Sequence, residues 1–226
     1  MRDDLVVVSV GVDGRDKYSN YALRLQNSCN ERKIESRIWI NEYPPQSPSH
    51  QQAPYAFKYF ALKHVYNEGF RKVLWLDSIC RIAGPIEEII KILDIDGYFF
   101  PPDGWYVGQW CKDSALGPLG LTRDEAMQIP VIAAKHLGFN FNFDKCLQLL
   151  EQFKYFIDYD NGEVIRGPWT NSKQECSNDP RVLGHRHDQT ILSVLSYRLG
   201  MYDKGVWNDM ISWNGEEKPK QVIRVH

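Results

Sequence analysis

The sequence has little cysteine, and its cysteines follow no pattern. Five cysteines occur in 226 residues, at positions 29, 80, 111, 146 and 176, and no two form a C-x-x-C pair. An odd number at such wide spacing argues against a disulfide framework and against a zinc cluster. We therefore expect reduced thiols and a cytosol-like compartment.

Long apolar runs are also lacking. No stretch approaches the ~18 consecutive apolar residues that suggest a membrane-spanning helix. The run from Leu5 to Val12 is short, is interrupted by Gly11 and follows two acidic residues. It has no small-residue cleavage site, so it does not read as a signal peptide. The expectation is a soluble, cytoplasmic protein with no membrane span.

Neither sign of charge is in excess. The chain has 27 basic and 29 acidic residues, interspersed, with a formal net charge of -2. This balance offers no electrostatic footprint for nucleic acid, so no nucleic-acid partner is expected. The G-x-G-x-x-G fingerprint, the P-loop and the G-x-S-x-G elbow are all missing. Their absence disfavours an α/β hydrolase or a methyltransferase.

The chain alternates buried strands with amphipathic helices. Residues 5–11 and 73–76 are short apolar runs between turn signals, which is typical of strands buried on both faces of a helix-covered parallel sheet. Residues 131–141 read as one further strand, with small residues at its middle. Helical spacing predicts helices over 18–33, 55–68, 144–157 and 188–199, and one from Pro85. The length fits a single α/β domain over 1–226.

Three segments are predicted to be irregular and to lie near the active site: residues 41–54, 101–120 and 158–186. The first is rich in proline, which excludes regular structure. The second carries Trp105, Tyr106 and Trp110 among glycines and prolines. These rings have two interpretations: they stack on sugar faces, or they pack a long loop onto the domain.

Two charged residues stand at informative positions. Asp77 directly follows the apolar run 73–76, and ligands of open α/β sheets bind outside the carboxyl ends of the strands. Its alternative role is to cap the helix near Pro85 or to close a turn. Lys58 falls near the first turn of its helix, where an exposed lysine is the alternative.

A second polar group opens the last strong helix. His185, Arg186, His187, Asp188 and Gln189 cluster at its N-terminus, which favours an anion site. Asp188 as a plain N-cap is the alternative, but that role explains only one of the five residues.

Three stretches together resemble the GT-A family of nucleotide-sugar glycosyltransferases: residues 55–58, 73–77 and 184–189. They occur in the family's order within residues 5–200. The likeness is to small single-domain viral and bacterial members, one of which acts on a chlorella-virus capsid glycan. It implies a single GT-A, Rossmann-like domain with a mostly parallel central sheet flanked by helices.

The resemblance also implies a function. It points to a hexosyl- or deoxyhexosyltransferase that moves a sugar from a UDP-sugar donor to a carbohydrate or glycoprotein acceptor. The alternative is a non-catalytic nucleotide-sugar or glycan-binding domain of the same fold. The residues expected to be catalytic are Asp188, His187 and Gln189. Those expected to bind the donor are Gly11, Val12, Asp13, Tyr18, Lys58, Asp77, Ser78 and Arg186.

A divalent metal, Mn²⁺ or Mg²⁺, is the expected cofactor, with Asp77 as its ligand. The family usually presents Asp-x-Asp at this strand end, whereas this chain has Ile79 at the second position. One aspartate with the diphosphate and water could hold such a cation. Alternatively Asp77 holds the ribose hydroxyls, and Lys58, Arg81 or Arg186 neutralises the diphosphate.

Overall fold

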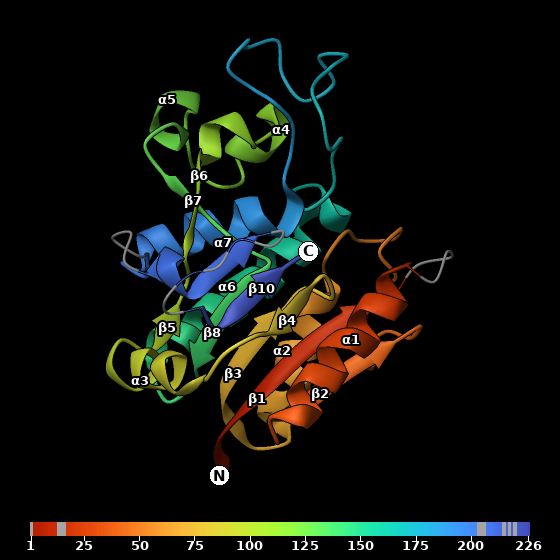
Figure 1. The fold of residues 1–226 in the computed structure, drawn as a ribbon. Coiled ribbons are helices and arrows are strands. Elements are labelled where there is room, and N and C mark those ends of the chain that lie inside the picture. The colour runs from red at the N-terminus through yellow and green to blue at the C-terminus, as the bar shows by residue number, and fades with distance from the viewer. Residues whose placement is uncertain (1, 13–16, 203–206, 214–215, 217, 219–220) are drawn as a thin grey trace.

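The computed structural model describes residues 2–12, 17–202, 207–213, 216, 218 and 221–226. Its centre is a five-stranded sheet (Figure 1), in the order β2 (Glu35–Ile40), β1 (Arg2–Gly11), β3 (Phe70–Leu76), β8 (His136–Asn140) and β5 (Tyr98–Phe99). Strand β1 runs parallel to β2 and β3, and β8 runs antiparallel to β3 and β5. The predicted α/β fold with a mostly parallel central sheet is therefore confirmed.

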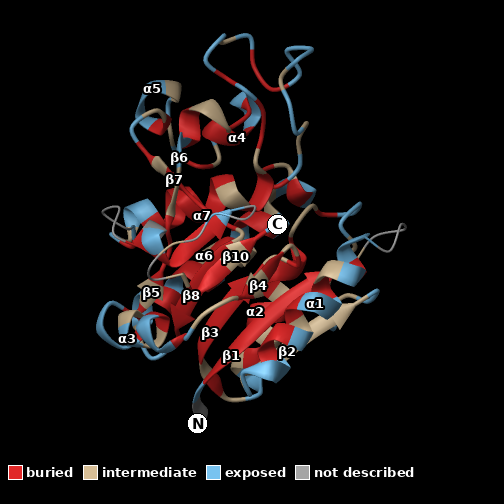
Figure 2. Cartoon of the chain, in the orientation of Figure 1, coloured by how far each residue is buried: buried red, intermediate tan, exposed pale blue. Residues whose placement is uncertain are grey.

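Alternate side chains of the inner strands pack into two separate hydrophobic cores. Val6 and Val8 of β1 pack on one face of the sheet, and Leu5 and Val7 pack on the other. The first face is covered by α2 (Phe57–Asn67), α6 (Asp144–Asp158) and α7 (His187–Arg198). The second is covered by α1 (Lys17–Glu31) and α3 (Glu87–Ile95). Figure 2 shows the resulting burial of β1 and β3, as their continuous apolar runs predict.

Two small sheets complete the fold. One joins β4 (Cys80–Ile82), β10 (Ile223–Val225) and β9 (Ile211–Trp213), and the other pairs β6 (Pro102–Tyr106) with β7 (Pro130–Ile132). The remaining short elements are η1 (Val107–Gln109), α4 (Asp113–Leu116), α5 (Arg123–Ala126), η2 (Tyr159–Gly162) and η3 (Trp207–Met210). Within the described ranges, none of the helices is both long and apolar enough to cross a bilayer.

Two predictions about elements are wrong. Residues 131–141 form two strands, because the chain turns at 133–135 and passes from β7 in a small sheet to β8 in the central one. Ala133 donates its N–H to Pro101 and accepts from the N–H of His136, which closes that turn. The segment 101–120 is not irregular throughout, since it contains β6, η1 and α4; β6 forms because it has β7 as a partner.

Gly11 allows β1 to approach α1 closely. A Cβ atom at this position would lie 2.4 Å from Cβ of Ala22 and 2.6 Å from the backbone oxygen of Tyr18. The start of α1 therefore lies directly against the end of β1, and Gly11 contributes space to the site instead of a side chain.

We expect Gly11→Ala to lower the free energy of unfolding by about 1–3 kcal/mol, since overpacking displaces α1. Urea denaturation measures the effect. Gly117→Ala is the matched control, because an added Cβ there meets no atom within 4 Å, and it should leave stability unchanged or slightly raised. Equal stability of Gly11→Ala and the wild-type protein would contradict the close packing.

Candidate functional site

A cavity of ≈840 Å³ opens at the carboxyl ends of β1 and β3. Its size is that of a small-molecule site. Val12 at the end of β1 and Asp77 after β3 form part of its wall. Residues from three distant segments complete it: Tyr43, His50 and Gln51; Asp103, Trp105 and Trp110; Trp169 and Arg186.

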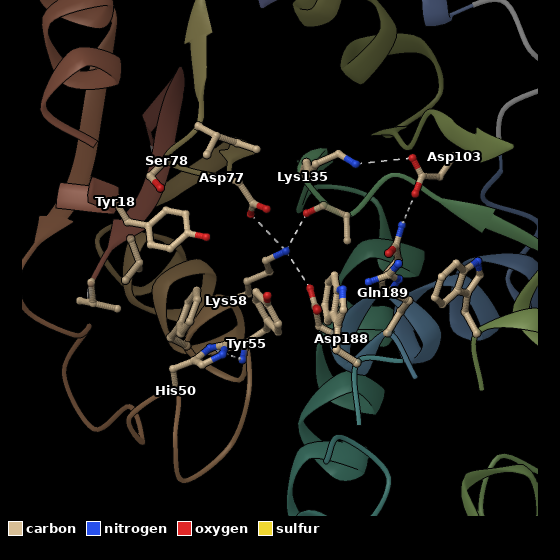
Figure 3. Close-up of a pocket in the computed structure, with 18 of the residues that line it drawn as sticks. Tyr18, His50, Tyr55, Lys58, Asp77, Ser78, Asp103, Lys135, Asp188 and Gln189 are labelled. Carbon is tan, nitrogen blue, oxygen red and sulfur yellow. Dashed lines mark hydrogen bonds and ion pairs between the residues drawn. The ribbon is translucent and has the colours of Figure 1, made fainter. Parts of the chain in front are cut away.

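Lys58 lies at the centre of the cavity wall, between two carboxylates (Figure 3). Its Nζ atom is 2.7 Å from Oδ2 of Asp188 and 3.3 Å from Oδ1 of Asp77. It also donates to the backbone oxygen of Ala134 at 2.7 Å. The contact with Ala134 has hydrogen-bond geometry, whereas the two carboxylates neutralise the ammonium as ion pairs. The side chain is 3% exposed, so the alternative of an exposed lysine is wrong.

The charge of Lys58 is maintained by its partners. Burial alone would lower the pKa of this lysine, but Asp188 and Asp77 outweigh burial and hold the pKa above its ordinary value. Burial raises the pKa of the Asp188 carboxyl, and the contact with Lys58 opposes that rise. Lys58 is therefore an ammonium ion at neutral pH.

Each carboxylate is oriented by its own element. Asp77 donates its N–H to the backbone oxygen of Lys135 at 2.8 Å, and its Oδ1 accepts from Nε1 of Trp75 at 2.8 Å. Its backbone oxygen accepts from Cys80, so the residue also closes a turn while its side chain faces the cavity. Asp188 is the second residue of α7, which has Arg186 at its N-cap position, so the N-cap alternative for Asp188 is wrong.

A second polar chain extends from α7 to β6. Nε2 of Gln189 donates to Oδ2 of Asp103 at 2.8 Å and to the backbone oxygen of Ile132 at 2.9 Å. Oδ1 of Asp103 lies 3.5 Å from Nζ of Lys135 (Figure 3). Because both amide hydrogens of Gln189 are engaged, its side-chain oxygen is the atom left to accept a bond from a ligand.

Arg186 is held between two indole rings. Its guanidinium carbon is 3.7 Å from the ring centre of Trp110 and 3.8 Å from that of Trp169. Nη1 is buried and has no hydrogen-bond partner, and Arg186 forms no ion pair with any residue that the structure describes. The guanidinium group of Arg186 is therefore a cation in a fixed orientation with an N–H donor available to a ligand. Trp110 and Trp169 thus pack on a cavity cation and also line the cavity.

His187 lies behind this wall. Its side chain is buried, its Nδ1 is 2.9 Å from the backbone oxygen of Ile165, and its ring stacks on Trp169 with the centroids 5.7 Å apart. Burial lowers the pKa of His187, which favours the neutral imidazole. Its backbone φ of +46° is in the left-handed region, which is unusual for a residue with a side chain.

The other predicted site residues fall into four groups. Val12, Tyr18 and Ser78 line the cavity together with Lys58, Asp77, Arg186, Asp188 and Gln189. Gly11 and His187 lie next to it without lining it, and Arg81 lines a different pocket. Asp13 lies outside the described residues.

Sequence reasoning missed Asp103, Lys135, His50 and Tyr55, all of which line the cavity. The proline-rich stretch around His50 and the turn at Lys135 have no periodicity that indicates which way a side chain points. A signal existed only for Asp103, which follows the apolar strand 97–100 as Asp77 follows its own strand.

The side chains around Asp77 do not fit a tightly held divalent cation. Ile79 supplies no ligand, and no group of three His, Cys, Asp or Glu suited to a metal occurs among the described residues. Oδ1 of Asp77 already faces two donors, and the other nearby carboxylate, Asp188, contacts the same ammonium. A second cation here would be repelled by Lys58.

Comparison with known proteins supports the fold. No model of a known family and no curated protein sequence matches this chain. A glycosyltransferase involved in glycosylation of the major capsid of PBCV-1 is 12% identical, with 98% of this chain and 93% of that chain covered and a TM-score of 0.57. Mouse xyloside xylosyltransferase 1 is 8% identical, with 99% of this chain and 97% of that chain covered and a TM-score of 0.49. The galactosyltransferase LgtC is 12% identical, with 99% of this chain and 86% of that chain covered and a TM-score of 0.45. The chain therefore has a GT-A-like glycosyltransferase fold, as the resemblance implied.

We expect Lys58→Met to destabilise the protein by about 3–5 kcal/mol, because it leaves Asp188 buried without a counter-charge. Adding Asp188→Asn should restore part of that loss, since the pair is coupled. Urea denaturation of the two variants measures both effects. Lys63→Met is the control, because Lys63 lies on the same helix in an exposed pair with Glu151 and should change stability by less than about 1 kcal/mol. If Lys58→Met behaved like Lys63→Met, the buried ion pair would be refuted.

Proposed function

We propose that the protein is a glycosyltransferase that uses a UDP-sugar and glycosylates a hydroxyl of a carbohydrate or glycoprotein acceptor. The reaction releases UDP and one proton. The observation that carries the proposal is the convergence of Asp77 and Asp188 on Lys58 in one cavity of a GT-A-like fold. The carboxyl ends of the strands are where ligands of such sheets bind, and carboxylates held there can accept hydrogen bonds from the hydroxyls of a nucleotide sugar.

The donor is proposed to bind along the length of the cavity. Val12, Tyr18 and Ser78, with the backbone of Gly11, surround the nucleoside. Asp188 faces the sugar, and the free oxygen of Gln189 accepts from a sugar or acceptor hydroxyl. Tyr55, Trp105 and Trp169 supply the aromatic faces on which sugar C–H surfaces pack.

Protein cations are proposed to stabilise the leaving group. Breaking the bond between the anomeric carbon and the diphosphate places negative charge on UDP, which needs fixed positive charge nearby. Lys58 is balanced by two carboxylates, and Lys135 faces Asp103. Arg186 forms no ion pair with a described side chain, although the more distant Asp103 opposes the effect of burial on the Arg186 pKa, and its fork geometry matches a phosphate. His187 is assigned to positioning Arg186 and Asp188 from behind the wall.

Incubation with a panel of UDP-sugars and measurement of released UDP test the proposal. Asp77→Asn and Asp188→Asn should each lower turnover by at least about 10²-fold, since both carboxylates fix the charge around the reacting bond. Asp96→Asn, at an exposed carboxylate, should retain full turnover. Binding of a UDP-sugar without turnover in the wild type would favour the non-catalytic binding domain instead. Full activity of Asp188→Asn would remove Asp188 from the mechanism.

We expect transfer to survive metal removal, because the residues around Asp77 do not fit a divalent cation. Turnover in excess EDTA should stay within about twofold of turnover with Mn²⁺, since the described residues offer no set of three metal ligands. Arg186→Met should lower kcat by about 10²–10³-fold in both conditions. Arg181→Met, at an exposed arginine, is the control. Loss of turnover in EDTA, with recovery on adding Mn²⁺, would show that a metal acts after all.

A further inference from the structure

Arg81 belongs to a second polar pocket, of ≈400 Å³, which lies between α1 and the small sheet β4–β10–β9. Its wall carries Arg24, Arg32, Arg81 and Arg224, with Asn27 and Glu31. Four guanidinium groups therefore share one small volume with one carboxylate. This concentration of positive charge differs from the rest of the chain, where acids and bases are interspersed.

The single carboxylate does not balance the cluster. Glu31 lies 3.7 Å from Nη1 of Arg32, and Arg32 also donates to the backbone oxygen of Ala83 at 3.2 Å. Arg24, Arg81 and Arg224 form no ion pair with any residue in the described part of the chain. The pocket therefore keeps an excess of positive charge after its internal contacts are counted.

The fold holds two of these arginines directly opposite each other. Arg81 of β4 and Arg224 of β10 are partners in the antiparallel ladder. Like charges at such positions destabilise a strand pair. Nε of Arg81 is buried and has no hydrogen-bond partner. Burial and the charges of Arg224, Arg24 and Arg32 also lower the pKa of Arg81. An anion in the pocket would offset the repulsion between these arginines and give Nε of Arg81 an acceptor.

We propose that this pocket binds a phosphate group. Guanidinium forks donate pairs of parallel N–H bonds to phosphate oxygens, and two arginines that lie side by side on one face of a sheet can both reach one such group. Arg81 and Arg224 supply guanidinium donors, Arg224 while it also contacts the side chain of Gln221, Arg24 approaches from α1, and the amide of Asn27 adds a neutral donor. The site is separate from the cavity proposed for sugar transfer, and it does not depend on that function.

A bound phosphate would also restrain the segment that carries Asp77. Asp77, Ser78 and Ile79 line the large cavity, whereas Arg81 and Ile82 line the arginine pocket. Residues 77–82 thus separate the two sites. A phosphate shared by Arg81 and Arg224 joins β4 to β10 more firmly, and the turn from Asp77 to Cys80 leads directly into β4.

Thermal unfolding of the full chain with inorganic phosphate, at ionic strength held constant with sodium chloride, tests the proposal. Phosphate that binds the native state should raise the melting temperature in proportion to the logarithm of its concentration above Kd. The Arg81→Gln/Arg224→Gln variant should lose this rise. Without phosphate it should melt at or above the wild-type temperature, because the opposed charges are gone. Arg181→Gln, at an exposed arginine outside the pocket, should keep the full phosphate response.

Flotation with lipid vesicles distinguishes between two sources of the phosphate group. If the wild-type protein floats with phosphatidic acid vesicles but not with phosphatidylcholine vesicles, and the double variant floats with neither, the phosphate belongs to a lipid headgroup. If inorganic phosphate raises the melting temperature but the protein does not float with either kind of vesicle, the ligand is free phosphate or a soluble phosphomonoester. The proposal is overturned when the double variant responds to phosphate as the wild type does. It is also overturned when sodium chloride alone reproduces the response, or when neither assay detects binding.

Discussion

The buried ammonium of Lys58 is the contact on which the site depends. A charge that is 3% exposed is tolerated only with close partners, and Lys58 finds them in Asp77 after β3 and Asp188 in α7. The contact therefore ties α2, β3 and α7 together at one point. The same three residues line the cavity, so the stability of this corner and the geometry of the site both depend on the contacts of Lys58.

The distribution of charge in the cavity follows from this pairing. Lys58 balances Asp77 and Asp188 in part, and Lys135 faces Asp103, so these groups mostly cancel. Arg186 is the exception among the described cavity residues, because its neighbours are two indole faces. An aromatic sandwich orients a guanidinium without neutralising it. The three cations and three carboxylates balance overall, but the charge of Arg186 is the one that stands apart from an ion pair among these described residues.

Much of this could be predicted from the sequence, for physical reasons. Val73–Leu76 had to be a buried strand, and a buried strand of an α/β sheet delivers the next residue, Asp77, to the ligand-binding edge. The environment of Lys58 could not be predicted. Helical periodicity indicates which face of α2 is apolar, but it does not indicate that Lys58 contacts carboxylates 19 and 130 residues away in the sequence. Lys135 was missed for a related reason: its turn exists only because β7 and β8 join different sheets.

The backbone at His187 explains how a helix start can present a carboxylate inward. A residue with a side chain at φ +46° stores strain of about 1–3 kcal/mol, which persists only where surrounding contacts determine it. The bond from His187 to Ile165 and its stack on Trp169 are such contacts. Because this residue turns the chain sharply at the first position of α7, Asp188 faces Lys58 instead of capping the helix. The cluster of polar residues at 185–189 is thus divided between the cavity and the scaffold. Arg186, Asp188 and Gln189 face the cavity, while His187 fixes the bend that directs them there.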